Sequence, residues 1–299
     1  MTIPSAMLSP FAPLPLRAQA IVVAVAAIGP VAMFANHGMV VILIAAALLT
    51  LVDPATRRQL ASRRSAALTV AAMVGPLMAW AAASYWWTFQ PEHSLEVAAY
   101  RSALFVALAV VAGAAASLTA DEARRMAAWL VPAGFVLPLV LGFELATDGF
   151  VVKHLHHYRP GGNDHLATTY PAGSITAIMA WPLAVAAWAR WGWRGVAAVI
   201  AASLVVILFG HSSAPKLAIL ASLGVAVLAL AAPRRVALGF AVVLVVAMAV
   251  LPFVLPPFLV DDGSHFRDVP WNLRHRLYIW QFVTQRIADH PVLGWGMDT

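Results

Sequence analysis

The sequence contains no cysteine, and charged residues make up only 11% of its 299 positions. Without cysteine the chain has no disulfide, no thiolate metal site and no cysteine nucleophile. A soluble protein carries about 25% charged residues, so 19 basic and 13 acidic residues are too few to cover a soluble fold of this length. Hydrophobic residues reach 62%, and the mean hydropathy is +0.82. The composition therefore predicts an integral membrane protein, and makes nucleic-acid binding a poor explanation of the net charge of +6.

Nine apolar stretches are candidates for membrane-spanning helices, because a span needs roughly 20 mostly apolar residues. The shorter ones, of about 22 Å at 1.5 Å per residue, require local thinning of the bilayer or snorkelling flanks. The sequence thus predicts an all-α, polytopic transmembrane bundle over residues 1–258, followed over residues 259–299 by the beginning of a large outward loop. The nine stretches are Ala18–Ala35, Gly38–Val52, Ala66–Phe89, Ser102–Leu118, Met126–Ala146, Leu166–Ala189, Val196–Gly210, Leu217–Ala232 and Val236–Phe258.

Basic residues alternate between the connections, which predicts the orientation because cytoplasmic loops retain Lys and Arg. One set of connections holds more basic than acidic residues, whereas the opposite set holds more acidic ones. We therefore expect a cytoplasmic N-terminus and an outward-facing tail after Phe258, with all ten histidines on the outward side. The first set contains Arg17, Arg57, Arg58, Arg63, Arg64, Arg124, Arg125, Arg190, Arg194, Arg234 and Arg235.

The outward loop Thr147–Tyr170 is the first candidate for chemistry. Its turn Arg159-Pro-Gly-Gly-Asn163 leaves backbone amides accessible beside a guanidinium. Glycine permits close approach of a ligand and arginine forms bidentate contacts with phosphate, so an anionic headgroup fits here. A zinc site and a solvated loop without a ligand remain as alternatives. The zinc ligands would be His154, His156 and His157, at a loose spacing.

Two further outward segments carry basic side chains. The turn Gly210–Lys216 brings Lys216 to the membrane surface, where simple snorkelling competes with ligand binding. The segment Asn272–Asp289 has apolar residues three or four apart and predicts an amphipathic helix on the bilayer surface. Such a helix would turn Arg276 toward an anionic lipid headgroup, unless its arginines are simply solvated.

Two motifs in the chain resemble those of the O-antigen ligase and polysaccharide polymerase superfamily of bacterial inner-membrane glycosyltransferases. Arg276-Leu-Tyr-Ile-Trp280 and the later His290-Pro-Val-Leu-Gly294-Trp-Gly296 are similar to that family's pattern at the start of its large periplasmic loop. Arg159, Gly161, Gly162 and Asn163 resemble an earlier element. In place of the family's Ser-Arg-Gly turn, this chain offers Lys216.

The resemblance implies the function, the partners and the site. Such enzymes use an undecaprenyl-diphosphate-linked glycan as donor, and the ligases transfer it to a sugar of the lipid A core at the periplasmic face; no metal or other cofactor is needed. Arg159, Lys216 and Arg276 would then bind the diphosphate, supported by a second set of residues. The supporting residues would be Asn163, Trp280, His290, Gly294 and Gly296.

The resemblance places the catalytic histidine beyond Thr299, so no catalytic residue is assigned in this chain. We then expect either a fragment, a truncated product or a chain that is inactive alone. A polymerase that extends the polysaccharide is the alternative within the same class. A membrane transporter or a non-catalytic partner in envelope assembly are alternatives of another class. A transporter is expected to place ionisable groups near the bilayer midplane, which the nine stretches lack.

Overall fold

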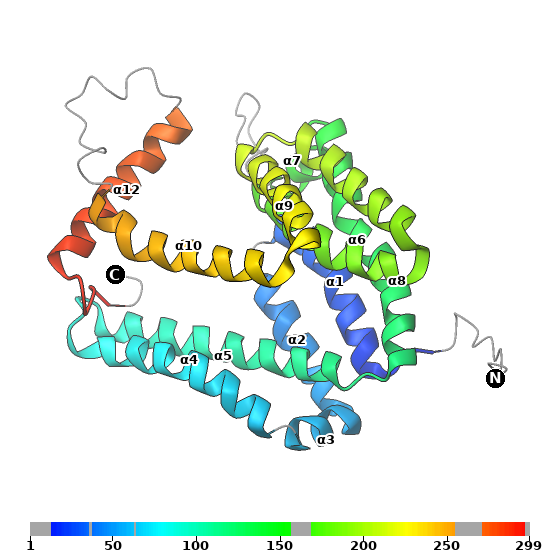
Figure 1. Ribbon diagram of the computed structural model, residues 1–299, viewed down its shortest axis with the longest axis horizontal. Helices are drawn as coiled ribbons and strands as arrows, with labels where there is room; N and C mark the ends of the chain where they lie inside the picture. Colours follow the sequence, from blue (N-terminus) through cyan, green and yellow to red (C-terminus); the bar gives the residue numbers. More distant parts are fainter. Residues whose placement is uncertain (1–12, 36–37, 63, 157–168, 255–270, 297–299) are drawn as a thin grey trace. The chain divides into compact units, whose positions relative to one another are not determined.

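The computed structural model describes residues 13–35, 38–62, 64–156, 169–254 and 271–296, and these residues form helices and no strand (Figure 1). The chain divides into two compact units, which are described separately. Unit 1 comprises residues 1–71 and 103–222, and unit 2 comprises residues 72–102 and 223–299. The elements are α1 (Leu16–Phe34), α2 (Gly38–Val52), α3 (Pro54–Ser62), α4 (Arg64–Ala83), η1 (Ser84–Trp86), α5 (Pro91–Ala116), α6 (Ala120–Ala146), α7 (Phe150–His156), α8 (Thr169–Phe209), α9 (Ser213–Ala231), α10 (Pro233–Val254) and α12 (Trp271–Asp289).

The prediction of an all-helical protein with several apolar helices is confirmed, but the count of nine spans remains a prediction. Among the described residues, six helices are long and apolar enough to cross a membrane, or seven if the bent pair α2 and α3 counts as one span. The six are α1, α5, α6, α8, α9 and α10. Helix α2 has only 15 residues, which is shorter than a full span. The predicted boundary at Phe258 lies outside the described residues.

The 41-residue helix α8 covers two of the predicted stretches. It breaks at Gly192, whose φ of 61° and ψ of −148° are not helical. A straight helix of that length would be about 60 Å long, yet Thr169 at its start and Gly210 just after its end line the same small cavity. The two halves therefore run antiparallel as a hairpin. Gly195 allows this reversal, because a Cβ there would lie 2.8 Å from the Ala187 carbonyl oxygen.

In unit 1, α6 packs between α1 and α8. A small residue lets each pair of helices approach closely: a Cβ at Gly29 of α1 would lie 2.9 Å from Cα of Leu137, and one at Gly134 of α6 would overlap the Leu183 side chain. Close approach at small residues is how helices associate where lipid offers no hydrophobic driving force. Leu137 and Leu141 of α6 join Met33 and Ala172 in the same buried cluster.

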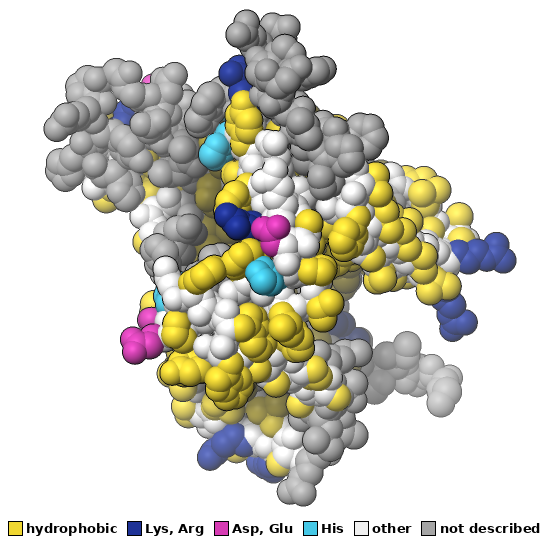
Figure 2. All heavy atoms as spheres, turned by 90° about the vertical axis from the view of Figure 1, so that its left-hand side faces the viewer, with side chains coloured by type: hydrophobic (Ala, Val, Ile, Leu, Met, Phe, Trp, Pro, Cys, Tyr) yellow, Lys and Arg dark blue, Asp and Glu magenta, His cyan; other side chains and the backbone are white. Residues whose placement is uncertain are grey.

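Apolar side chains cover much of the described surface on the face drawn in Figure 2, and charged side chains are few there. Helix α10 has no buried residue at all. A soluble protein does not expose apolar surface of this extent. The surface agrees with helices that face lipid.

Three charged residues join α1, α6 and the junction between α2 and α3 at one end of unit 1. Arg17 is 6% exposed and donates to Oδ2 of Asp53 at 2.8 Å and to Oε2 of Glu122 at 2.7 Å. Glu122 also forms the capping box of α6, since its side chain accepts from the Thr119 backbone N–H at 2.8 Å. One guanidinium thus ties together the starts of two helices and the bend after a third.

Asp53 lies between α2 and α3, outside both helices. Burial raises the pKa of its carboxyl. Hydrogen bonds from Arg17 and from the Ala55 backbone N–H, together with the Arg17 charge, lower the pKa by more than burial raises it. The net pKa lies below the ordinary value. Because the folded pKa is lowered, the stability that this group contributes is present above its unfolded pKa and is lost as the pH falls through the folded pKa.

We expect Arg17→Met to lower the thermal unfolding midpoint of the detergent-solubilised protein by roughly 5–10 °C, because removing one partner of a buried ion cluster leaves buried charges uncompensated. Acidification from pH 7 to pH 5 should then raise the midpoint of the variant, since protonation relieves its unpaired carboxylates, and should not raise that of the wild type. Arg124→Met is the matched control, because Arg124 pairs with Asp121 on the exposed surface and such pairs contribute little. Equal midpoints for both variants would contradict the conclusion that the ion pairs of Arg17 with Asp53 and Glu122 stabilise the fold.

Candidate functional site

The predicted diphosphate-binding residues fall in different parts of the chain. Arg159 and Asn163 lie outside the described residues. Lys216 lies half-buried in the first turn of α9 and belongs to unit 1. Arg276 is exposed on α12 and belongs to unit 2. Their joint role in binding a diphosphate therefore remains a prediction.

The first residues of the predicted loop Thr147–Tyr170 form the short helix α7 instead of irregular chain. Glu144, which is fully buried in α6, accepts the backbone N–H groups of Val151 at 2.9 Å and Val152 at 3.2 Å. This caps α7, a tertiary contact that hydropathy does not signal. Lys153 pairs with Asp148 at 2.6 Å, so this cation is already engaged locally.

The described residues do not form the ligand geometry that the zinc alternative requires. Nδ1 of His154 lies 2.6 Å from the Phe150 carbonyl oxygen within α7. In the described ranges, no three His, Asp or Glu side chains lie close enough together to hold a metal ion. The side chains of His156 and His157 lie outside what the structure describes.

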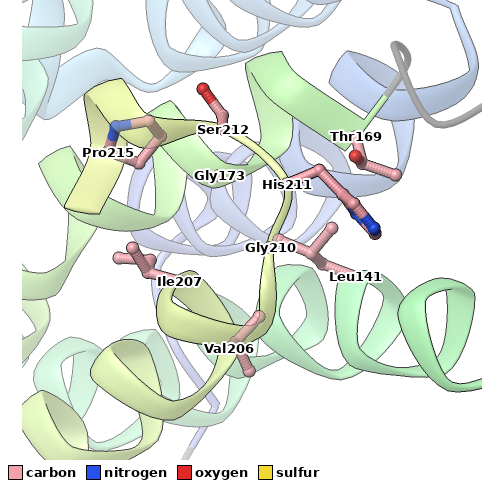
Figure 3. Close-up of a pocket in the computed structure, with 9 residues that line it drawn as sticks. All are labelled: Leu141, Thr169, Gly173, Val206, Ile207, Gly210, His211, Ser212 and Pro215. Atoms are coloured by element: carbon pink, nitrogen blue, oxygen red, sulfur yellow. The ribbon is translucent and has the colours of Figure 1, made fainter.

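A small cavity opens beside the turn between α8 and α9, and Pro215, which precedes Lys216 in the chain, lines it (Figure 3). Its volume is about 10 Å³, which holds at most one water molecule. Neither a sugar nor a diphosphate fits this space. It is lined by Leu141, Thr169, Gly173, Val206, Ile207, Gly210, His211, Ser212 and Pro215.

The amphipathic helix predicted over Asn272–Asp289 is confirmed as α12, Trp271–Asp289. After α12 the second motif of the resemblance, His290–Gly296, forms a compact turn. Gly294 has φ 67° and Gly296 has φ 110°, both in the left-handed region that favours glycine. A Cβ at Gly296 would also overlap the Thr88 side chain. The backbone of the turn therefore favours glycine at both positions, and the contact with Thr88 excludes a side chain at Gly296.

Trp295 sits at the centre of this turn and fixes it. Its Nε1 donates to the Arg286 carbonyl at 2.9 Å. Phe89 stacks on its indole at 5.3 Å between ring centroids, and the His290 ring meets it edge-on at 4.2 Å. The tail turn is thereby held against both α12 and the segment before α5.

Arg286 is the cation that sequence reasoning missed. Its guanidinium lies 5.0 Å from the Phe282 ring centroid and 5.1 Å from that of Trp295, and it forms a 3.5 Å ion pair with Asp289. The side chain is nevertheless 48% exposed. A spacing of four between Phe282 and Arg286 was the available signal, because such residues face each other on a helix.

These residues line an open groove of about 610 Å³ in unit 2, a size typical of small-molecule sites. Its walls are mainly aromatic and aliphatic, and Arg286 and His290 contribute polar groups to the lining. Such a groove fits an apolar ligand that carries an anionic group. The lining residues are Phe89, Phe282, Val283, Arg286, Ile287, His290, Gly294, Trp295 and Gly296.

We expect Gly296→Ala to detach the tail turn, because the added Cβ meets Thr88 and the backbone is left-handed. Limited proteolysis should then cleave the 290–296 region at least about tenfold faster, a change that corresponds to roughly 1.4 kcal/mol. Gly294→Asn is the matched control, since a Cβ at Gly294 meets open space and asparagine tolerates this φ. Unchanged cleavage of Gly296→Ala would refute the turn as described.

The candidate site rests on the groove in unit 2, the turn that shapes it and the exposed arginines of α12. Comparison with protein-family models, curated proteins and solved structures finds no match to this chain. The resemblance therefore depends on the motif residues themselves, and the function is inferred from their chemistry and geometry.

Proposed function

We propose that this chain belongs to a membrane glycosyltransferase that moves an undecaprenyl-diphosphate-linked glycan onto a lipid A core sugar. The observation that carries this proposal is the tail of unit 2. The two motifs of the resemblance lie there on one helix and the turn after it, and that turn forms one wall of a groove with apolar walls and a cation. A lipid-linked diphosphate has the matching chemistry, with an apolar chain joined to a strong anion.

The arginines have a definite task in such a transfer. A hydroxyl oxygen of the acceptor forms a bond to the anomeric carbon while the bond from that carbon to the diphosphate breaks, so negative charge builds on the leaving group. Guanidinium groups stabilise that charge by bidentate hydrogen bonds. Arg276 is exposed and Arg286 is half-exposed on the same helix. The proton of the acceptor hydroxyl passes to a base, which we assign to no residue of this chain.

The distribution of buried charge favours an enzyme over a transporter. A transporter needs ionisable groups near the middle of its spans. Among the described residues, the buried ionisable side chains are Arg17, Asp53 and Glu144. The first two belong to the ion cluster at one end of unit 1, and Glu144 caps α7 at the opposite end. The proposed donor and acceptor also meet at a membrane surface, where the groove residues offer both apolar and cationic contacts.

Deletion of the gene from its native chromosome tests the reaction class. Loss of long glycans from the lipid A core, with lipid-linked polymer accumulating, is the expected result for a ligase. Single repeat units on the core would instead indicate the polymerase alternative. Gel profiles of the lipopolysaccharide and mass spectrometry of the carrier lipids measure both outcomes. A normal glycan profile, together with normal carrier lipids, would overturn the proposal.

Arg276→Ala, introduced at the native locus, should lower glycan transfer on the order of 10²–10³-fold, the loss that follows removal of one charge-stabilising donor from an enzyme active site. Arg276→Lys should recover part of the activity, because it keeps the charge but loses the bidentate fork. Arg235→Ala is the matched control, since Arg235 is also exposed and lies at the start of α10. The proposal fails if Arg276→Ala transfers glycan as well as Arg235→Ala does, at equal protein level in the membrane.

A further inference from the structure

The tip of the α8 hairpin has an unusual surface that the proposed function does not use. The sequence Trp188-Ala-Arg-Trp-Gly-Trp-Arg194 surrounds the reversal at Gly192. Its three tryptophans are 62%, 49% and 67% exposed in chain order. Both arginines are exposed, and Arg194 lies 5.8 Å from the Trp193 ring centroid. Two cations and three large aromatic rings therefore share one turn of chain.

The tip lies at the arginine-rich end of unit 1. Val131, about three turns into α6, packs against Ala187 and Val199 on either side of the tip, whereas Leu141 near the end of α6 packs against Ala172 near the start of α8. Since α6 begins at the Arg17 cluster, the hairpin tip and that cluster occupy the same end.

Helix α3 adds exposed arginines to this end of unit 1. It bends by 90° from α2, and a Cβ at Gly113 of α5 would overlap the Leu60 side chain, so α3 packs closely against α5. Arg57 and Arg58 of α3 are exposed. A short helix perpendicular to a span, with basic residues on its exposed side, has the geometry of an element at the membrane surface.

The acidic residues at this end are already engaged. Asp53 and Glu122 bind Arg17, and Asp121 pairs with Arg124. The described part of unit 1 contains two other acidic residues, Glu144 and Asp148, and both lie at the α7 end. The acidic residues in the described part of unit 1 thus either have other partners at this end or lie at the α7 end, away from Arg190 and Arg194.

We propose that the hairpin tip, Arg190–Arg194, binds the phosphodiester headgroup of an anionic glycerophospholipid. Tryptophan prefers the headgroup region of a bilayer, where its ring is buried and its N–H is solvated. The two guanidinium groups, two residues on either side of Gly192, then meet the phosphate from both sides. The exposed arginines of α3 increase the local positive potential and draw such lipids to this end.

The test is lipid binding by the purified full chain, measured by native mass spectrometry during titration with phosphatidylglycerol. The double variant Arg190→Gln/Arg194→Gln should raise the dissociation constant for phosphatidylglycerol by about 25-fold, because each arginine near a membrane surface contributes about fivefold. Arg124→Gln is the matched control and should change it less than about twofold, since that arginine is paired with Asp121. Binding of phosphatidylcholine should be equal in all three proteins.

Three results would overturn the proposal. The first is unchanged phosphatidylglycerol binding by the double variant. The second is an equal loss in Arg124→Gln, which would mean that total charge matters and the tip does not. The third is displacement of the lipid by millimolar inorganic phosphate, which would indicate a site for a soluble anion. The unfolding midpoint of the double variant should match that of the wild type, because both side chains are exposed.

Discussion

Unit 1 depends on a single buried guanidinium. Arg17 satisfies two carboxylates from segments far apart in the chain, and by doing so aligns the starts of α1 and α6 with the bend between α2 and α3. A buried cation without these partners would carry a large desolvation cost, so only arrangements that bring Asp53 and Glu122 to Arg17 are stable. The register of α1 against α6 follows, and the close contact of Gly29 with Leu137 continues it further along the pair.

The two ends of unit 1 differ in the charges that their surfaces expose, and the Arg17 cluster lies at one of these ends. At its own end the acidic residues are engaged, and exposed arginines remain on α3 and at the tip of α8. At the opposite end lie α7, His154 and His211, where Glu144 is engaged as a helix cap. Ion pairing inside the bundle thus determines which charges are left for lipids or substrates. Positive charge is retained at one surface because its potential partners serve the fold.

The tail of unit 2 shows what the residues of one motif do for the structure. Gly294, Trp295 and Gly296 hold the turn against α12 and the segment before α5. His290 of this turn and Arg286 of α12 both line the groove. The two glycines of the motif are explained by backbone conformation and, at Gly296, by close contact with Thr88. The cation beside them, Arg286, lies outside the motif, and the rings of Phe282 and Trp295 pack close to its guanidinium.

The sequence by itself determined an apolar composition typical of a membrane protein, the helical class, the segregation of arginine among the connections and the amphipathic helix after residue 270. These properties depend on hydrophobicity and charge over a few turns of chain, which local sequence contains. Only the tertiary structure decided that α8 is one helix folded back at Gly192, that α7 forms where a loop was expected, and that Arg17 and Arg286 occupy key positions. For Arg17 the reason is distance along the chain: its partners lie 36 and 105 positions away, and no local pattern of residues encodes contacts of that range. The reversal in α8, the cap of α7 and the position of Arg286 depend on backbone angles and side-chain contacts at shorter range, which hydropathy and charge do not specify.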